Sequence, residues 1–214
     1  MSEFYKLCEF SIAKRRDELE EVLRLRFLAY SKAGKLGANL TVSDMEDEFD
    51  CRSEMHIARF RQEVIGSLRV ILNKESDALS YLRYVALPVP NLPLRKDIVE
   101  ASRLCVHPDY IGRGLFYPFA ARMALTAIKF NKRYILGGAT IDLVPVWERC
   151  GFVPMRITYP DEDFNCIEHH LMLMDTLRVS NGVGTHENFN AHFIPLLEAF
   201  SGMGKHSVSG FDIR

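Results

Sequence analysis

Apolar residues recur along the chain at two spacings, one typical of helices and the other of strands. Over residues 14–30 they fall three or four positions apart, which predicts an amphipathic helix. Residues 55–60 and 64–72 have the composition of strands, and the three polar residues between them predict a hairpin. Residues 98–106 form a largely apolar run typical of a central strand. Residues 31–53 are polar and glycine-containing, which predicts a long loop.

The second half of the chain alternates strands, turns and helices. A glycine turn at residues 112–114 precedes a helical pattern that begins at Leu115, and a short strand follows at residues 134–136. Together with the strand before the turn, these elements predict a βαβ unit. The other expected elements are a strand at 4–12, a short helix at 79–87, a helix at 141–149, a strand at 166–174 and a helix at 188–200. The order predicts one α/β domain, a mixed sheet with helices on both faces.

The boundaries of this domain follow from the same patterns. We expect residues 1–176 to form the domain and residues 177–214 to add a C-terminal helix and a tail packed on it. The tail, residues 201–214, is rich in glycine and serine, which favours mobility.

Arg26 places a charge in the middle of the apolar face of the first helix. It lies four residues from Val22 and Tyr30 and three from Leu23, so a surface position is not expected. Because a buried arginine without a partner is costly, Arg26 needs a carboxylate, a row of carbonyls or a ligand. The acidic segment 44–50 is the natural partner, in either a functional site or a structural ion pair.

Glu100 and Arg103 place charges inside the strand expected at residues 98–106. A spacing of three puts them on opposite faces of a regular strand, so they share a pocket only if a bulge intervenes. A structural salt bridge and a functional pair are both open at this point.

The composition limits the classes of function. Lys and Arg number 27 against 28 Asp and Glu among 214 residues, and this net charge of −1 argues against nucleic-acid binding through global charge. The five cysteines contain no C-x-x-C pair, which favours a reducing cytoplasm. The sequence has neither a signal-peptide pattern nor 18 consecutive apolar residues, so we expect a cytoplasmic protein without an integral membrane segment. Cys166, His169 and His170 do not repeat a zinc spacing, and we expect no metal.

A glycine turn between a strand and a helix exposes backbone N–H groups, and the helix dipole adds positive charge there. Gly112 and Gly114 are placed to bind an anion in this way. The segments 104–115 (LCVHPDYIGRGL) and 144–152 (VPVWERCGF) resemble two signature segments of the GNAT acyltransferase superfamily. The resemblance implies a GNAT-like, mostly antiparallel sheet with a V-shaped opening between its central strands. It also implies that a phosphopantetheine thioester binds at Val106, Gly112, Arg113 and Gly114.

Two residues depart from the family pattern. Asp109 stands where a basic or amide residue is usual, three positions before Gly112, and would repel a coenzyme A diphosphate. Trp147 replaces the tyrosine that often protonates the leaving thiolate, and an indole cannot act as a general acid. The arm of acyl carrier protein has a single phosphate, so acyl carrier protein is the expected donor and partner. Acyl-CoA is the other possible source of the thioester. Basic residues expected to meet it are Arg113, Arg122, Lys129, Lys132 and Arg133.

Residues 22–106 contain a second ordered set of motifs. They are Arg26 with Tyr30, a D-x-x-D pair at Asp47 and Asp50, Arg69 inside a strand, and an E-x-x-R pair at Glu100 and Arg103. The set resembles that of acyl-homoserine-lactone (autoinducer) synthases and long-chain N-acyl amino acid synthases. The lactone synthases commonly have a tryptophan that has no counterpart near Leu36, which favours the amino acid synthases.

This resemblance implies an N-acyltransferase that moves a long acyl chain from a thioester to the primary amine of an amino acid or related small molecule. Glu100 would take the proton of the amine, because an ammonium has no lone pair. Arg103 would organise the acidic loop, and Asp47 and Asp50 would hold the ammonium or shape the pocket. Arg26 would order the loop or bind an acceptor carboxylate. The residues expected to line the acceptor and acyl pocket are Tyr30, Arg69, Ser102 and Trp147.

Two other functions are compatible with these residues. The G-x-G and G-F segments also suit an acetyl-CoA-dependent GNAT N-acetyltransferase. Asp109 and Trp147 suit a non-catalytic module that binds an acyl group or a carrier protein.

Overall fold

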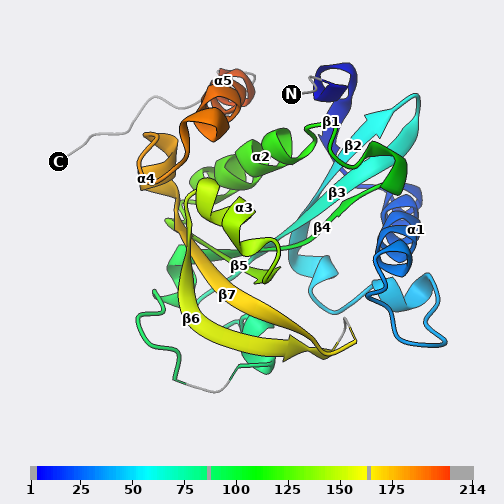
Figure 1. Ribbon diagram of the computed structural model, residues 1–214, viewed down its shortest axis with the longest axis horizontal. Helices are drawn as coiled ribbons and strands as arrows, with labels where there is room; N and C mark the ends of the chain where they lie inside the picture. The colour runs from blue at the N-terminus through cyan, green and yellow to red at the C-terminus, as the bar shows by residue number, and fades with distance from the viewer. Residues whose placement is uncertain (1–3, 86–87, 163–164, 203–214) are drawn as a thin grey trace.

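The computed structural model describes residues 4–85, 88–162 and 165–202, which form one sheet flanked by helices (Figure 1). The strand order is β1-β2-β3-β4-β5-β7-β6, and β4 and β5 are the parallel pair in an otherwise antiparallel sheet. The strands are β1 (Glu9–Ile12), β2 (Ser53–Phe60), β3 (Glu63–Leu72), β4 (Ile98–Val106), β5 (Tyr134–Thr140), β6 (Phe152–Asp161) and β7 (Ile167–Asp175). The α-helices are α1 (Arg16–Lys32), α2 (Phe116–Lys129), α3 (Val144–Arg149), α4 (Thr176–Ser180) and α5 (Glu187–Gly202). The expected mixed, mostly antiparallel α/β fold is confirmed.

Three apolar cores pack against the sheet, one below α1, one below α2 and a third that contains Ile98, Leu136 and Tyr159. The core below α1 contains Val22 and Ile57, whereas the core below α2 contains Phe119. Val64 and Ile65, neighbours on β3, belong to different cores, as the alternation of side chains along a strand requires. Figure 1 shows α1 apart from α2, α3 and α5, which lie together across the sheet. Helices therefore cover both faces, as the sequence predicts.

The edges of the sheet differ from the sequence prediction. The strand expected at residues 4–12 is a 3₁₀ turn, Phe4–Leu7, followed by the short β1. The sequence analysis assigns no element to residues 152–161, where the structure has β6, which contains Pro154 and Pro160. β6 lies at the edge of the sheet, where a residue without an N–H group is tolerated.

The helix expected at 79–87 and the tail expected at 201–214 lie partly outside the described residues. The short helix expected at 79–87 is a 3₁₀ turn over Ser80–Arg83, and residues 86–87 lie outside the described residues. The helix expected at 188–200 is α5, which packs on α2. Residues 203–214 of the expected tail also lie outside the described residues. Across the described ranges, no helix is long and apolar enough to cross a membrane.

β4 and β5, the parallel pair of the predicted βαβ unit, separate part-way along their length. Their pairing covers Ile98–Ala101 and Tyr134–Gly137, although β4 continues to Val106 and β5 to Thr140. In Figure 1 the long arm formed by β6 and β7 turns away from β2 and β3. The main chain of both central strands is therefore open beyond Ala101, in agreement with the V-shaped opening that the family resemblance implies.

A bulge in β4 begins at the level where the two strands separate. Ser67 pairs with Cys105 and Arg69 with Ser102, so β4 contains one residue more than β3 between these pairs. Arg103 lies in the bulge with a φ of 55°, in the left-handed region. The bulge that Glu100 and Arg103 would need in order to share a pocket is thus present, although only Arg103 lines the pocket described below.

Candidate functional site

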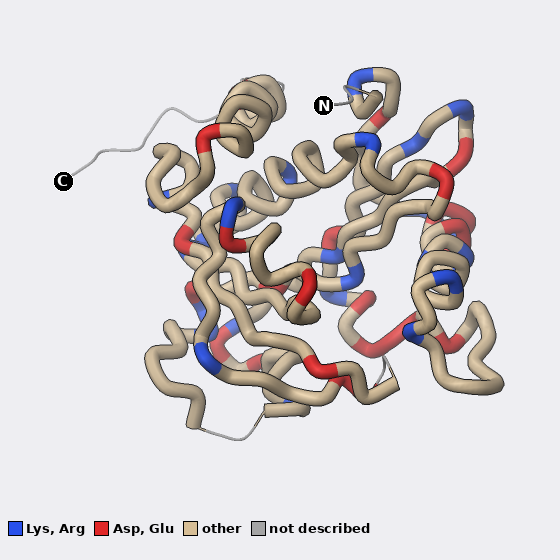
Figure 2. The backbone as a smooth tube through the Cα atoms, viewed as in Figure 1, with Lys and Arg blue, Asp and Glu red and all other residues tan. Residues whose placement is uncertain are grey.

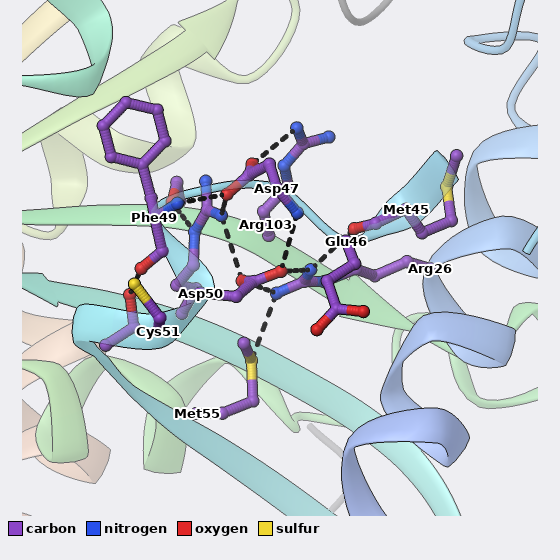
Figure 3. Close-up of polar contacts among 12 residues, drawn as sticks. Arg26, Met45, Glu46, Asp47, Phe49, Asp50, Cys51, Met55 and Arg103 are labelled. Carbon is purple, nitrogen blue, oxygen red and sulfur yellow. Dashed lines mark hydrogen bonds and ion pairs between the residues drawn. The ribbon is translucent and has the colours of Figure 1, made fainter. Parts of the chain in front are cut away.

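Arg26 of α1 is completely buried beneath the acidic loop between α1 and β2 (Figure 3). Its Nη1 and Nη2 donate to the two carboxylate oxygens of Asp50 at 2.9 and 3.0 Å. Nη1 also donates to the Met45 carbonyl oxygen at 2.9 Å, and Nη2 lies 3.2 Å from the Met55 sulfur. The predicted pairing of Arg26 with the acidic segment is confirmed.

Two further arginines reach the same loop from the central strands. Arg69 of β3 donates from Nη1 to both Asp47 and Asp50, and Arg103 of β4 donates from Nη2 to Asp47 at 3.2 Å. We call Arg26, Arg69, Arg103, Asp47 and Asp50 the arginine–aspartate cluster. Figure 2 shows acidic segments of this loop beside basic segments of the central strands. With three cations and two carboxylates, the cluster has an excess of one positive charge.

The cluster keeps both aspartates ionised. Burial opposes ionisation, but Arg69 and Arg103 hold the pKa of Asp47 below its ordinary value, and Arg26 with Arg69 does the same for Asp50. Asp47 also accepts a hydrogen bond from the Phe49 amide at 2.9 Å, and Asp50 accepts one from the Asp47 amide at 3.2 Å. The carboxylates thus fold their own loop and tie it to the sheet.

Glu100 lies near the cluster but makes a separate set of hydrogen bonds. Its carboxylate accepts from Asn73 Nδ2 at 3.0 Å, from Ser80 Oγ at 2.8 Å and from the Tyr81 amide at 3.2 Å. Glu100 is completely buried, and the structure does not bring it together with Arg103 as an ion pair. Its expected role as the base stays a prediction, and the Ser80 hydroxyl links Glu100 to the pocket described below.

A pocket of about 150 Å³ lies where β4 and β5 separate. Small residues of the two strands, Ala101, Gly138 and Ala139, form part of its wall. Its basic side chains are Lys35, Arg69, Arg83 and Arg103. Its remaining polar and aromatic residues include Tyr30, Ser80, Tyr81, Tyr84, Ser102, Thr140, Trp147, Tyr159, Asp161 and His169.

The structure divides the sequence-predicted residues into two groups around this pocket. Tyr30, Arg69, Ser102, Arg103 and Trp147 line it together. The residues that do not line it are Arg26, Asp47, Asp50 and Glu100, which lie behind the wall and support it.

Sequence reasoning missed the wall of the pocket that β6 and β7 supply. Tyr159 and Asp161 stand on β6, which the sequence pattern does not predict, and His169 stands opposite Tyr159 on β7. His169 Nδ1 lies 2.9 Å from the Ile167 carbonyl oxygen, and because a carbonyl can only accept, Nδ1 carries the hydrogen. Burial lowers the pKa of His169, which favours the neutral ring. The available signal was strand alternation, which separates His169 from His170.

The glycine turn is open to solvent at the start of α2. Gly112 and Gly114 have φ values of 77° and 82°, and a side chain at Gly112 would meet no other atom within 4 Å. Val106 ends β4 just before the turn, and the Asp109 side chain is 84% exposed. The Arg113 guanidinium lies exposed beside the turn. The expected binding residues are thus adjacent and accessible.

Trp147 lines both the pocket and a second, smaller cavity. Its ring makes edge contacts with Phe116 and Phe152 at centroid distances of 5.1 Å. The second cavity has a volume of about 20 Å³, is lined in part by Trp147, Phe152 and Met172, and shares Ala101 and Gly138 with the larger pocket.

The basic residues expected to dock a carrier protein do not form one patch. Arg113 precedes α2, whereas Lys129 ends it, and a helix of 14 residues separates these positions by about 20 Å. Lys129 also pairs with Glu54, and Arg122 is half-buried, with its Nε 3.2 Å from His56 Nδ1. Arg113 is the member of this set that lies beside the glycine turn.

The comparisons with known proteins agree with this geometry. Residues 25–118, from α1 to the first turn of α2, match the family described as the acetyltransferase (GNAT) domain. FeeM, an N-acyl amino acid synthase from uncultured soil microbes, superposes with a TM-score of 0.60, covering 82% of this chain and 94% of its own at 10% identity. The protein has the GNAT fold. The GNAT fold that the motifs implied is therefore confirmed.

Two other solved structures are similar in fold. An acyl-CoA N-acyltransferase from Pseudomonas aeruginosa has a TM-score of 0.57 at 18% identity, covering 78% of this chain and 99% of its own. The AHL synthase LasI has a TM-score of 0.55 at 12% identity, covering 79% and 89%. At these identities the likeness concerns the fold alone. No curated protein matches the sequence.

Proposed function

We propose that this protein is an N-acyltransferase that moves an acyl group from a thioester to the primary amine of an amino acid or a related small molecule. One observation carries the proposal. The two central strands separate between an exposed glycine turn suited to phosphate and a pocket with charges of both signs. A thioester arm lying along the open strands would bring its carbonyl carbon to the pocket near Ala101 and Gly138.

The reaction requires a neutral amine and an acceptor for its proton. The amine nitrogen forms a bond to the thioester carbon, the carbon–sulfur bond breaks, and the thiolate takes up a proton. Two side chains are candidates for the base. Glu100 reaches the pocket through the Ser80 hydroxyl, whereas His169 lines the pocket as a neutral imidazole. Direct exposure to the pocket favours His169.

The basic side of the pocket supports an acceptor that carries a carboxylate. Arg83 pairs at 3.1 Å with Glu48, which is 68% exposed, and such a surface pair contributes little and exchanges easily. Arg69 and Arg103 are instead fixed by Asp47 and Asp50. This arrangement supports an organising role for the two aspartates and an acceptor-binding role for the arginines that line the pocket.

The glycine turn supports a donor with a single phosphate, and acyl carrier protein is our favoured donor. Asp109 stands exposed before Gly112, where its charge would repel a second phosphate. Arg113 is the adjacent cation. A carrier protein adds a contact surface of its own, which compensates for the nucleotide that coenzyme A would contribute.

The volume of the two cavities favours a second candidate, transfer of a short acyl group such as acetyl. A cavity of about 150 Å³ holds a molecule the size of benzene, and one of about 20 Å³ holds no more than a single water. A long chain therefore requires Trp147 or Met172 to move. Methionine side chains change conformation at low cost, so both chain lengths are compatible with the fold.

The decisive experiment measures transfer with a matrix of donors and acceptors. Purified protein is incubated with acyl chains of 2 to 16 carbons, carried on coenzyme A or acyl carrier protein, and with the twenty standard amino acids. Mass spectrometry identifies the N-acyl product, and free thiol gives the rate. We expect an N-acyl amino acid and a higher kcat/KM on the carrier protein. A better rate with acetyl-CoA would select the second candidate, and binding without turnover would exclude both.

A further inference from the structure

The Tyr159 hydroxyl is buried at the pocket without a hydrogen-bond partner among the described residues. Tyr159 is 1% exposed and lines the pocket from β6. Its ring stacks against those of Tyr84 and His169, at centroid distances of 5.9 and 5.7 Å. The hydroxyl lies against Gly138 of β5, so closely that a methyl group at Gly138 would overlap it. The absence of a side chain at Gly138 thus allows the hydroxyl to reach the opening between the central strands.

A buried hydroxyl without a partner destabilises the protein unless a ligand or a water satisfies it. Tyr81, which also lines the pocket, provides a contrast, because its hydroxyl donates to the Ala101 carbonyl oxygen. The two tyrosines contact each other edge to face at 6.0 Å. Tyr81→Phe therefore removes a hydrogen bond within the protein, whereas Tyr159→Phe removes a hydroxyl that is available to a ligand.

The surroundings of Tyr159 select the chemistry of that ligand. Burial, together with Tyr81, Asp161, Tyr84 and Glu100, raises the pKa of the phenol well above its ordinary value, so it stays protonated. Two of these neighbours, Asp161 and Glu100, are carboxylates, and they favour a ligand that is a cation or a hydrogen-bond donor. The basic residues of the pocket are Arg69 on β3, Arg83 in the segment after β3, Arg103 on β4 and Lys35 after α1. A molecule with an amine and a carboxylate would find partners of both charges around this pocket.

We infer that the Tyr159 oxygen accepts a hydrogen bond from the amine of the acceptor and holds this amine beside Gly138, where the thioester carbon would lie. This inference rests on the proposed function and names a residue that selects an amine. Tyr159 positions the nitrogen for attack and does not remove its proton, because the phenol retains its own hydrogen.

The test compares Tyr159→Phe with Tyr81→Phe as a matched control. For Tyr159→Phe we expect an unchanged or higher Tm, unchanged donor affinity, and a 10- to 100-fold lower kcat/KM for the amino acid acceptor. For Tyr81→Phe we expect a lower Tm, because the buried Ala101 carbonyl loses its donor. Isothermal calorimetry without donor then compares the amino acid that binds most tightly to the wild type with the carboxylic acid that lacks its amino group. Wild-type protein should bind the amino acid more tightly, and Tyr159→Phe should lose that preference.

The outcomes separate this inference from the proposed function. If wild-type protein transfers acyl groups and Tyr159→Phe does so with an unchanged acceptor kcat/KM, Tyr159 does not bind the amine, and the proposed function stands. A Tm loss in Tyr159→Phe equal to that in Tyr81→Phe would also overturn the inference. If wild-type protein transfers nothing, the proposed function fails, and the calorimetric preference for the amine still decides the role of Tyr159.

Discussion

Replacement of Arg26 by methionine tests whether the arginine–aspartate cluster holds the acidic loop in place. Methionine keeps much of the length of the side chain and removes the guanidinium. The change deletes two hydrogen bonds to Asp50 and one to the Met45 carbonyl, all between 2.9 and 3.0 Å. Asp50 would then keep Arg69 as its charged partner.

The expected loss of stability follows from the burial of these groups. Removing one partner of a buried ion pair costs about 3–5 kcal/mol, because a charge stays buried without compensation. The remaining contact between Arg69 and Asp50 at 3.0 Å places the expected loss near the lower limit, at about 3 kcal/mol. At roughly 2–4 °C for each kcal/mol in a protein of this size, Tm should fall by roughly 6–12 °C.

The assay is thermal and denaturant unfolding of Arg26→Met beside a control on the same helix, Arg24→Met. Arg24 is 58% exposed and pairs with Glu20 at 3.4 Å, so its removal should change stability by less than about 0.5 kcal/mol. The double variant Arg26→Met/Asp50→Asn should be more stable than the sum of the single losses predicts, because it leaves no unpaired carboxylate. If Arg26→Met loses no more stability than Arg24→Met, the cluster does not anchor the loop.

Three further predictions concern the donor, the base and acid stability. Gly112→Asp should weaken donor binding at least tenfold through charge repulsion, whereas Gly34→Asp, at a similar φ of 67° in open space, should not, and calorimetric titration with the donor measures both. His169→Gln should lower kcat by about 10²- to 10⁴-fold with little change in Tm, whereas Glu100→Gln should mainly lower Tm; the reverse result would restore Glu100 as the base. Because the pKa of Asp50 is lowered in the folded state, its stabilisation is complete above the unfolded value of about 3.9 and disappears as pH falls through the folded value. Tm measured between pH 2 and 6 should therefore fall less steeply in Asp50→Asn than in the wild type.

The sequence alone determined the features that depend on local periodicity. The spacing of apolar residues located α1, β2, β3, β4 and α2, because burial of one face imposes a period on each element. The same geometry required a partner for Arg26, since an arginine on an apolar face cannot stay unpaired. The E-x-x-R spacing showed that Glu100 and Arg103 could share a pocket only if β4 contained a bulge. It could not show whether that bulge was present.

The tertiary structure decided the features that depend on which strands become neighbours. The bulge exists because β3 and β4 pair out of step between Ser67 and Arg69, and pairing register is not a local property. β6 forms despite its prolines because it finds an edge position beside β7. Through that placement alone Tyr159 and His169 enter the pocket, and Glu100 meets Ser80 from a turn 20 residues away. Long-range pairing brings these groups together, and a one-dimensional pattern carries no signal of it.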